Sequence, residues 1–340
     1  MMISQTHSLK MQLNEEEFEK QREIARSCWY LTGATASGKS EISIHLAKTI
    51  DAEIISLDSM SIYRDMNIGT AKPEDEYRQQ VPHHLIDIVD PPNEFSVSEY
   101  VDAAFQKIEE IRSRQKEVLF VGGTALYMKT LLRGAFQGPP ADWEFRESIR
   151  KEIEEVGHEH LIQRLEQVDP LSAHKLHPND TRRIIRALEV YKLTGSPISH
   201  LQTQFDEGNG PDEYRVFSIR WPREILHQRI DQRVEQMFSR GFVDEAKMLR
   251  EKYGSLGRTA SQAVGYKEVF ELLDGKIEEE DVIQLVKNRT HQFARHQETW
   301  FRGLTEVQWV ERSEAITPAE VADHIANPAS SENHQDSLDE

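Results

Sequence analysis

The sequence contains one cysteine, no long apolar segment and fewer basic than acidic residues. Because Cys28 is the only cysteine among 340 residues, no disulfide can form within the chain, which is typical of a reducing cytosol. No apolar run approaches the roughly 20 residues that a membrane-spanning helix needs. The N-terminus also lacks the charged and then apolar pattern of a signal peptide. We therefore expect a cytoplasmic protein that does not enter a membrane.

The charge is strongly negative, with 59 acidic against 41 basic residues and a formal net charge of −18 at pH 7. Taken alone, this balance argues against a nucleic-acid partner. Acidic residues gather toward the two ends, however, with Glu15 to Glu17 near the start and four acids without Lys or Arg from Asn327 onward. We expect residues 1–26 to be a polar extension and residues 313–340 to be an acidic tail.

One motif has the spacing of a phosphate-binding loop, Gly-x-x-x-x-Gly-Lys-Ser. An apolar segment precedes it and an amphipathic segment follows, which is the strand–loop–helix context that such a loop needs. Its backbone N–H groups stabilise an anion at a helix N-terminus, Lys39 adds a positive charge, and the Ser40 hydroxyl can bind Mg²⁺. The pattern does not distinguish ATP, GTP and an organic diphosphate. The predicted phosphate-binding residues are Gly33, Ala34, Thr35, Ala36, Ser37, Gly38, Lys39 and Ser40.

Short apolar segments alternate with amphipathic helical segments, which predicts an α/β fold with a parallel sheet flanked by helices, like that of P-loop NTPases. The expected strands are 28–32, 52–57, 84–89, 118–121, 215–220 and 307–310. From residue 138 to 205 only helical periodicity is found. We therefore predict a core of residues 27–137 and 206–312, interrupted by an all-helical insertion, 138–205. Long helices are expected at 223–253, 261–273 and 280–301.

Polar residues follow the expected strands where parallel sheets bind ligands. Asp58 can hold Mg²⁺, act as a general base or simply cap a helix. Thr124, after Gly122 and Gly123, offers a hydroxyl to a ligand or caps the next helix. Arg223, at a helix start, can clamp a diphosphate or be an ordinary surface residue.

Two helices have features that suit RNA. In 181–186, Arg182, Arg183 and Arg186 recur at helical spacing. The helix over 282–303 interleaves basic residues with Phe293, Trp300 and Phe301, and aromatic rings can stack on unpaired bases. Each signal is weak by itself, since charged helix faces are usually only solvated.

A set of motifs, taken together, resembles the tRNA dimethylallyltransferases of the bacterial type. Besides the phosphate loop these include Ser-Leu-Asp-Ser-Met-Ser-Ile-Tyr, Asn-Ile-Gly-Thr-Ala-Lys-Pro, Pro-His-His-Leu-Ile-Asp and Gly-Gly-Thr-Ala-Leu-Tyr. The motifs occupy residues 33–40, 56–63, 67–73, 82–87, 122–127, 177–190, 264–268 and 295–302. They follow one another in order from about residue 28 to 312. Ala263 stands where many bacterial members have cysteine, and the zinc-finger extension of nuclear and cytosolic eukaryotic members is absent.

The resemblance implies transfer of the dimethylallyl group from dimethylallyl diphosphate to N6 of adenosine 37, beside the tRNA anticodon, with release of diphosphate. It implies that the phosphate loop, Arg223 and Mg²⁺ on Ser40 hold the diphosphate. It assigns Asp58 as the general base, with Thr124 as the second catalytic residue. The insertion would bind the anticodon stem-loop, and we expect the enzyme to be a monomer. The implied tRNA contacts are Asp58, Ser59, Met60, Ser61, Thr124, Glu147, Arg182, Arg183, Ile184, Ile185 and Arg186.

Three other functions stay open on the sequence. A small-molecule P-loop kinase would use Asp58 for metal or substrate and the insertion as a lid. A related enzyme would prenylate free AMP or ADP. A nucleotide-dependent switch protein is the least favoured, because no guanine-reading motif accompanies the loop.

Overall fold

The computed structural model describes residues 15–134, 138–202, 211 and 214–327. The chain divides into two compact units. One consists of Arg133–Glu207 together with the chain up to Phe18, and the other consists of Glu19–Leu132 with Gly208–Glu340. Among the described residues, no helix is both long and apolar enough to cross a membrane.

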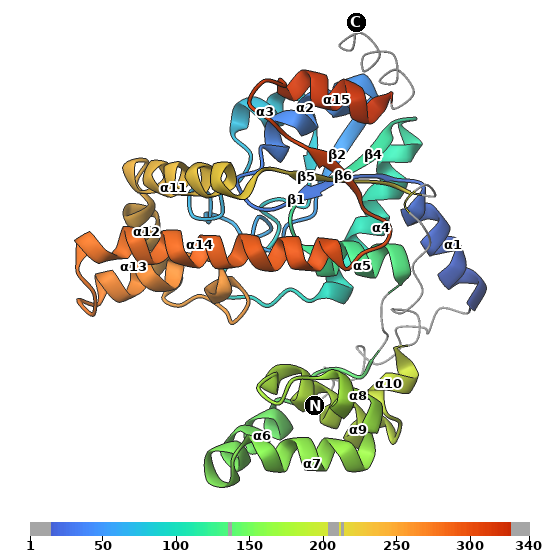
Figure 1. Cartoon of the computed structure of the whole chain (residues 1–340), viewed down its shortest axis with the longest axis vertical. Helices are drawn as coiled ribbons and strands as arrows, with labels where there is room; N and C mark the ends of the chain where they lie inside the picture. Colours follow the sequence, from blue (N-terminus) through green and yellow to red (C-terminus); the bar gives the residue numbers. More distant parts are fainter. Residues whose placement is uncertain (1–14, 135–137, 203–210, 212–213, 328–340) are drawn as a thin grey trace, which may run out of the picture. The chain divides into compact units, whose positions relative to one another are not determined.

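The larger unit is built on one parallel sheet with the strand order β3-β2-β4-β1-β5-β6 (Figure 1). The six described strands are β1 (Trp29–Gly33), β2 (Ala52–Ser56), β3 (His83–His84), β4 (Glu117–Val121), β5 (Arg215–Arg220) and β6 (Gln308–Glu311). β1 lies in the centre, with Trp29 level with Leu119 on one side and Arg215 on the other. The predicted α/β class with a parallel sheet is confirmed.

The third strand is shorter than predicted. We expected residues 84–89, but only His83 and His84 pair with β2. Leu85 and Asp87 both have φ of 58°, a left-handed conformation that a strand cannot contain. The chain therefore leaves the sheet at Leu85, and Val89 then forms an isolated bridge with Tyr63 outside the strands.

Helices cover both faces of the sheet because successive strand residues point to opposite sides. Leu31 and Leu119 belong to one buried cluster, while their neighbours Tyr30 and Phe120 belong to the other. The helices of this unit are α1 (Glu15–Arg26), α2 (Lys39–Thr49), α3 (Asp75–Gln80), α4 (Val97–Ser113), α5 (Ala125–Arg133), α11 (Arg223–Ser239), α12 (Phe242–Tyr253), α13 (Tyr266–Leu273), α14 (Glu279–Arg302) and α15 (Pro318–Ala326), with a short 3₁₀ turn at Ala260–Gln262.

α11 to α14 extend beyond the strands on one side of this unit (Figure 1). The single helix predicted over 223–253 is two helices, because Gly241 has φ of 96° and ends the first one. α11 packs along α14.

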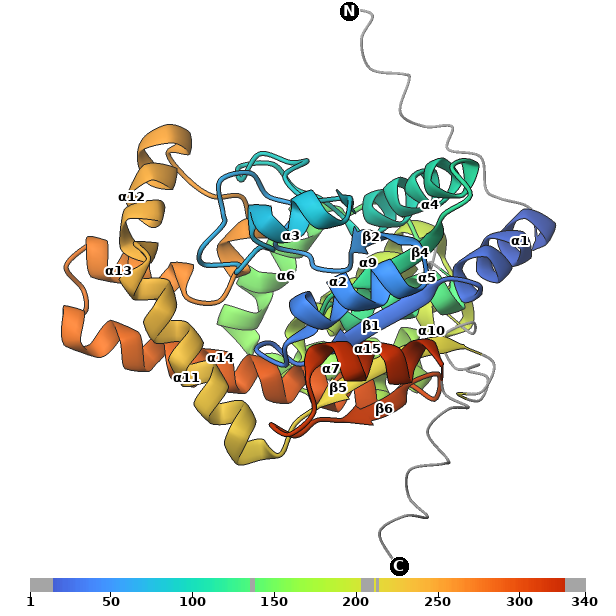
Figure 2. The ribbon, with the colours of Figure 1, turned by 90° about the horizontal axis from the view of Figure 1, so that it is seen from above.

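Both ends of the chain contribute more to the core than the sequence suggested. The expected acidic tail from residue 313 is wrong for residues 318–326, which form α15 against α2 (Figure 2). Val321, Ala322 and Ile325 are buried there. At the other end, Ala25 of α1 is buried and accepts a hydrogen bond from Tyr30, so the polar extension stops short of residue 26.

In the other unit, the described part of the insertion is helical and contains no strand. It consists of α6 (Trp143–Val156), α7 (His158–Val168), α8 (Pro170–Lys175), α9 (Thr181–Thr194) and α10 (Ile198–Leu201). These helices have a separate buried core that includes Phe145, Leu165, Ile184 and Leu188. The role of this unit in binding tRNA stays a prediction.

Candidate active site

The phosphate loop lies between β1 and α2, where two glycines are required by geometry. Gly33 and Gly38 have φ of 136° and 88°, and a Cβ at Gly33 would lie 2.6 Å from the carbonyl oxygen of Ile219 in β5. Ala34, Ala36 and Ser37 are buried between them. The backbone of the loop therefore packs against β5 at a distance that no side chain at residue 33 would allow.

Lys39 lies over the loop that precedes it. Its Nζ donates to the carbonyl oxygens of Gly33 and Ala34 at 3.0 and 2.7 Å and to Ser37 Oγ at 3.2 Å. Burial, together with the nearby positive charge of Arg233, lowers the pKa of Lys39 to about 7, and the charge of Asp58 only partly offsets this. An anion beside Lys39 would favour its protonated form.

Two arginines of α11 that the sequence analysis missed belong to this site: Arg229 contacts the loop, and Arg233 lies close to Lys39 and Asp58. Arg229 donates from Nε to the carbonyl oxygen of Ala36 at 2.9 Å and lies over the ring of Trp221, whose Nε1 donates to Ser37. Arg233 lies near Asp58, and burial lowers its pKa. They lie four residues apart on α11, a spacing that the sequence offered as a signal. Lys39, Arg229 and Arg233 together form a cationic site that suits a diphosphate.

Arg223, the arginine that we predicted for this site, is exposed on the first turn of α11. Its charge helps to lower the pKa of His227, after the effect of burial and of His291. In the described part of the chain no hydrogen bond joins Arg223 to the phosphate loop. Its role in holding diphosphate stays a prediction.

The structure brings Asp58 and Thr124 together, as predicted from the ends of their strands. Ser59 N donates to Thr124 Oγ1 at 3.0 Å, and Thr124 N donates to the carbonyl oxygen of Leu57 at 3.1 Å. A Cβ at Gly122 would lie 2.2 Å from that same carbonyl oxygen, so only glycine allows the two strand ends to approach this closely.

Asp58 fixes its own turn with one carboxylate oxygen. Oδ1 accepts hydrogen bonds from the N–H groups of Met60 and Ser61 at 2.8 and 3.4 Å. Oδ2 accepts none from the residues that the structure describes. Ser59 and Met60 are half-buried in this turn and Ser61 is buried. The capping role and a chemical role are therefore compatible, since they use different oxygens.

Gln297 of α14 joins the phosphate loop to the turn that follows β4, and it is a third residue that the sequence analysis missed. Its Oε1 accepts from Thr35 N at 2.8 Å, and its Nε2 donates to the carbonyl oxygen of Gly123 at 2.9 Å. Gln297 is buried although it is polar, between Ala294 and Phe301 on one helical face. A polar residue at such a buried helical position was the signal available in the sequence.

Ser40, the predicted Mg²⁺ ligand, is exposed on the first turn of α2, and its hydroxyl makes no hydrogen bond to a described residue. The described residues hold no group of three His, Cys, Asp or Glu that could bind a metal ion. The Ser40 hydroxyl is an oxygen donor of the kind that Mg²⁺ accepts, and Mg²⁺ at phosphate sites commonly takes its other ligands from phosphate oxygens and water.

The predicted tRNA contacts in the insertion fall into two classes. Arg182, Arg183 and Glu147 are exposed, the last paired with Arg150 at 3.2 Å. Ile184 and Ile185 are only 0% and 3% exposed, so the prediction of tRNA contact is wrong for their side chains, which form the core of the insertion.

Arg186 has a structural partner. Its guanidinium pairs with the fully buried carboxylate of Glu189 at 2.5 Å and donates to the carbonyl oxygen of Pro139 at 2.9 Å. Glu189 also accepts two hydrogen bonds from Arg146 and one from Asp142 N. These bonds together outweigh the effect of burial and lower the pKa of Glu189.

The chain is similar to known proteins over most of its length. Residues 61–304 match the family model described as IPP transferase. A tRNA dimethylallyltransferase from Rhodopirellula baltica is 46% identical over 286 residues, covering 82% of this chain and 86% of the relative. One from Geobacter sulfurreducens is 42% identical over 281 residues, covering 83% and 90%.

Solved structures are similar over most of the chain as well. The full-length tRNA isopentenylpyrophosphate transferase from Bacillus halodurans has a TM-score of 0.63 and 36% identity, covering 89% of this chain and 96% of that one. A eukaryotic dimethylallyltransferase acting on tRNA has a TM-score of 0.72 and 29% identity, covering 89% and 78%. The predicted resemblance is confirmed, and the chain belongs to the family of tRNA dimethylallyltransferases.

Proposed function

We propose that this chain transfers the dimethylallyl group from dimethylallyl diphosphate to N6 of adenosine 37 in the anticodon loop of tRNA, releasing diphosphate. The observation that carries the proposal is that Asp58, whose Oδ2 accepts no hydrogen bond from a described residue, lies beside a cationic phosphate loop. A group-transfer enzyme needs both parts. The names of the relatives support the dimethylallyl group that is transferred and the tRNA acceptor.

The cationic site would serve the leaving group. As the bond between C1 and the diphosphate oxygen breaks, negative charge grows on the diphosphate. The loop N–H groups, Lys39, Arg229 and Arg233 are preorganised to stabilise that charge. Mg²⁺, held by Ser40 and by the diphosphate itself, would neutralise further charge when it is bound. The loop thus serves a departing diphosphate and not a nucleotide.

Asp58 would serve the nucleophile. The N6 amine of adenine is a weak nucleophile because its lone pair is delocalised into the ring. As the N6–C1 bond forms, Oδ2 of Asp58 accepts the proton that N6 loses. Oδ1 meanwhile keeps its hydrogen bond to Met60 N, so the carboxylate keeps its orientation during proton transfer. Thr124 holds Ser59 and the turn around Asp58. The adenine must leave its stack to reach this carboxylate.

We further propose that the insertion binds the anticodon stem-loop, using exposed residues such as Arg182 and Arg183 for RNA phosphates. Arg186 would then contribute by holding α9 through Glu189. We propose a monomeric cytoplasmic enzyme, and gel filtration of the purified chain with and without tRNA tests the oligomeric state.

The test combines purified protein, Mg²⁺ and radiolabelled dimethylallyl diphosphate. One tube receives unmodified tRNA with adenosines at positions 36 to 38, and a parallel tube receives free AMP. We expect label in tRNA, loss of labelling in Asp58→Ala, and full labelling in the control Asp75→Ala, which changes an exposed acid on α3. Label only in AMP would replace the acceptor that we propose. ATP turnover without prenyl transfer would favour a kinase, and an active Asp58→Ala would overturn the role of the base.

A further inference from the structure

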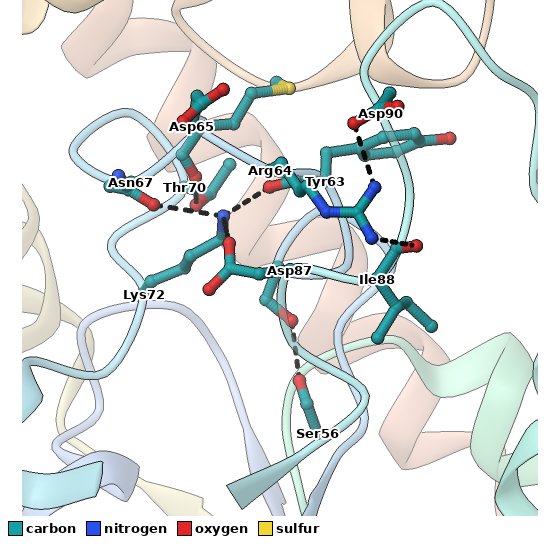
Figure 3. Close-up of polar contacts among 12 residues, drawn as sticks. Ser56, Tyr63, Arg64, Asp65, Asn67, Thr70, Lys72, Asp87, Ile88 and Asp90 are labelled. Atoms are coloured by element: carbon teal, nitrogen blue, oxygen red, sulfur yellow. Dashed lines mark hydrogen bonds and ion pairs between the residues drawn. The ribbon is translucent and has the colours of Figure 1, made fainter.

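The loop that follows the turn carrying Asp58 contains a buried lysine, Lys72. The side chain of Lys72 is only 4% exposed. Its Nζ donates to the backbone oxygen of Tyr63, to Asn67 Oδ1 at 3.1 Å and to Asp87 Oδ1 at 2.6 Å (Figure 3). Lys72 belongs to the motif at 67–73 and Asp87 to the motif at 82–87, and no site described above uses either residue.

The ion pair holds Asp87 in a conformation that costs energy. Asp87 has φ of 58°, a left-handed conformation that residues other than glycine seldom adopt. Its carboxylate is shared by Lys72 and by Arg78, whose contact measures 3.0 Å. With its side chain held in this way, the N–H of Asp87 points at the carbonyl oxygen of Ser61 at a distance of 3.2 Å.

Ser61 connects this ion pair to Asp58. Its N–H donates to Oδ1 of Asp58 at 3.4 Å, and its hydroxyl lies 3.2 Å from the carbonyl oxygen of Asp58. The same hydroxyl is 2.6 Å from Ser56 Oγ at the end of β2. Lys72, Asp87, Ser61 and Asp58 therefore form a continuous series of polar contacts within one part of the fold.

The loop that carries Lys72 is fixed from its other side. Glu245 of α12 accepts hydrogen bonds from the N–H groups of residues 67, 68 and 69 at 2.7 to 3.0 Å and from Tyr266 Oη at 2.7 Å. A Cβ at Gly69 would lie 2.2 Å from the ring of Phe242. Because Glu245 holds residues 67–69 in place, loss of the Lys72 ammonium should change mainly the position of its partner Asp87.

We propose that Lys72 is a positioning residue for prenyl transfer, because through Asp87 and Ser61 it sets the orientation of the Asp58 carboxylate. The inference rests on the proposed function of Asp58 as the base. Misplacement of a catalytic group by about 1 Å can cost on the order of 100-fold in rate. Since Lys72 does not contact the phosphate loop, its loss should affect turnover and spare the binding of dimethylallyl diphosphate.

Arg64 provides a matched control from the same loop. It pairs with Asp90 at 2.9 Å (Figure 3), but the two side chains are 46% and 47% exposed. Among the described residues, neither side chain is hydrogen-bonded to Ser61. Removal of Arg64 deletes a cation, its exposed ion pair and its hydrogen bond to the carbonyl oxygen of Ile88, while leaving the series of contacts to Asp58 intact.

The experiment measures single-turnover transfer to tRNA and the KM for dimethylallyl diphosphate. We expect Lys72→Met to lower the rate constant by roughly 10- to 100-fold with a KM within about threefold of the unchanged chain. Arg64→Met should stay within about twofold in both. Asp58→Ala should be slow, and Asp58→Ala/Lys72→Met should be no slower, because the second change acts only through the group that the first removes.

Several outcomes would overturn the inference. Lys72→Met at full rate, an equal loss from Arg64→Met, or a Lys72 effect that multiplies in the double variant would each do so. Should Lys72→Met not fold, as judged by its Tm, Asp87→Asn keeps the shape of the partner and must show the same loss of rate with unchanged KM. Full activity of Asp58→Ala would instead refute the role of Asp58 as the general base. Absence of any transfer to tRNA by the unchanged chain would refute the proposed function.

Discussion

Binding of dimethylallyl diphosphate should transfer a proton from solvent to Lys39. Without an anion, burial and the charge of Arg233 lower the pKa of this lysine to about 7. A diphosphate within hydrogen-bond reach favours the charged ammonium and so raises the pKa toward its ordinary value of 10.5. The sign follows directly: the complex binds more protons than the free enzyme, so affinity decreases as pH rises through about 7 and above.

The number of protons that are taken up on binding depends on the pH. With a pKa of about 7, Lys39 would be about one-tenth protonated at pH 8, and in the complex it would be almost fully protonated. Uptake should therefore be about 0.9 proton per ligand at pH 8 and about 0.5 at pH 7. The phosphate groups, with a second pKa of about 6, contribute little at pH 8. The Kd should rise by about tenfold from pH 8 to pH 9.

Isothermal titration calorimetry measures this uptake when each titration is repeated in buffers of different ionisation enthalpy. Lys39→Met should bind more weakly and take up almost no proton. Lys48→Met, which changes an exposed lysine further along α2, should match the unchanged chain. Uptake near zero at pH 8 would refute the reasoning about the buried ammonium. Uptake that persists in Lys39→Met would show that another group carries the proton.

Three further changes test the architecture. Gln297→Leu leaves the part-buried Thr35 N–H and the buried carbonyl oxygen of Gly123 unpaired, and at about 1–3 kcal/mol each the free energy of unfolding in urea should fall by about 2–6 kcal/mol, against less than about 0.5 for the exposed Gln292→Leu. Ile325→Ala, at a residue 1% exposed, should cost about 2–5 kcal/mol in the same assay, whereas a loosely attached tail would show no change. Because the folded pKa of Glu189 is lowered, its stabilisation is present above pH 4.5 and lost as pH falls further. Glu189→Gln should therefore lower Tm at pH 7 and flatten its dependence on acid, and an unchanged acid profile would contradict the assignment.

The central part of the fold could be predicted because its signals are local. The phosphate loop combines glycines, a lysine and a serine at fixed spacing between a strand and a helix. Asp58 and Thr124 follow directly after apolar strands, and parallel strands end at one edge of a sheet. Their contact through Ser59 follows from that rule together with the absence of a side chain at Gly122.

Features that depend on distant parts of the chain could not be predicted in this way. Gln297 meets Thr35 from 262 residues away, and no spacing in the sequence announces such a pair. Which arginine of α11 faces the phosphate loop depends on how that helix packs along α14, so the helix-start position that suggested Arg223 did not lead to Arg229 or Arg233. The left-handed Leu85 and Asp87, which end β3 early, depend on tertiary contacts.

For α15, signals of a helix start were present in the sequence, but the acidic composition of the C-terminal segment was given more weight. Thr317 and Glu320 form a capping box at the start of α15, and Pro318 occupies its first turn. Val321, Ala322 and Ile325 then recur on one face. The acidic composition that begins soon afterward led us to assign the whole segment to the tail. Helix-start signals should therefore be weighed before composition near a terminus.

The central position of β1 has a consequence for synthesis on the ribosome. β1 is made early, but one of its two neighbours, β5, is made only after the whole insertion, and the glutamine that satisfies Thr35 N comes later still. The nascent chain must therefore keep an apolar strand with an open edge from aggregating while about half of the protein emerges. The insertion has its own core and can fold during that interval. The active site would therefore be complete only late in synthesis, when α14 has left the exit tunnel and Gln297 can accept the hydrogen bond from Thr35 N.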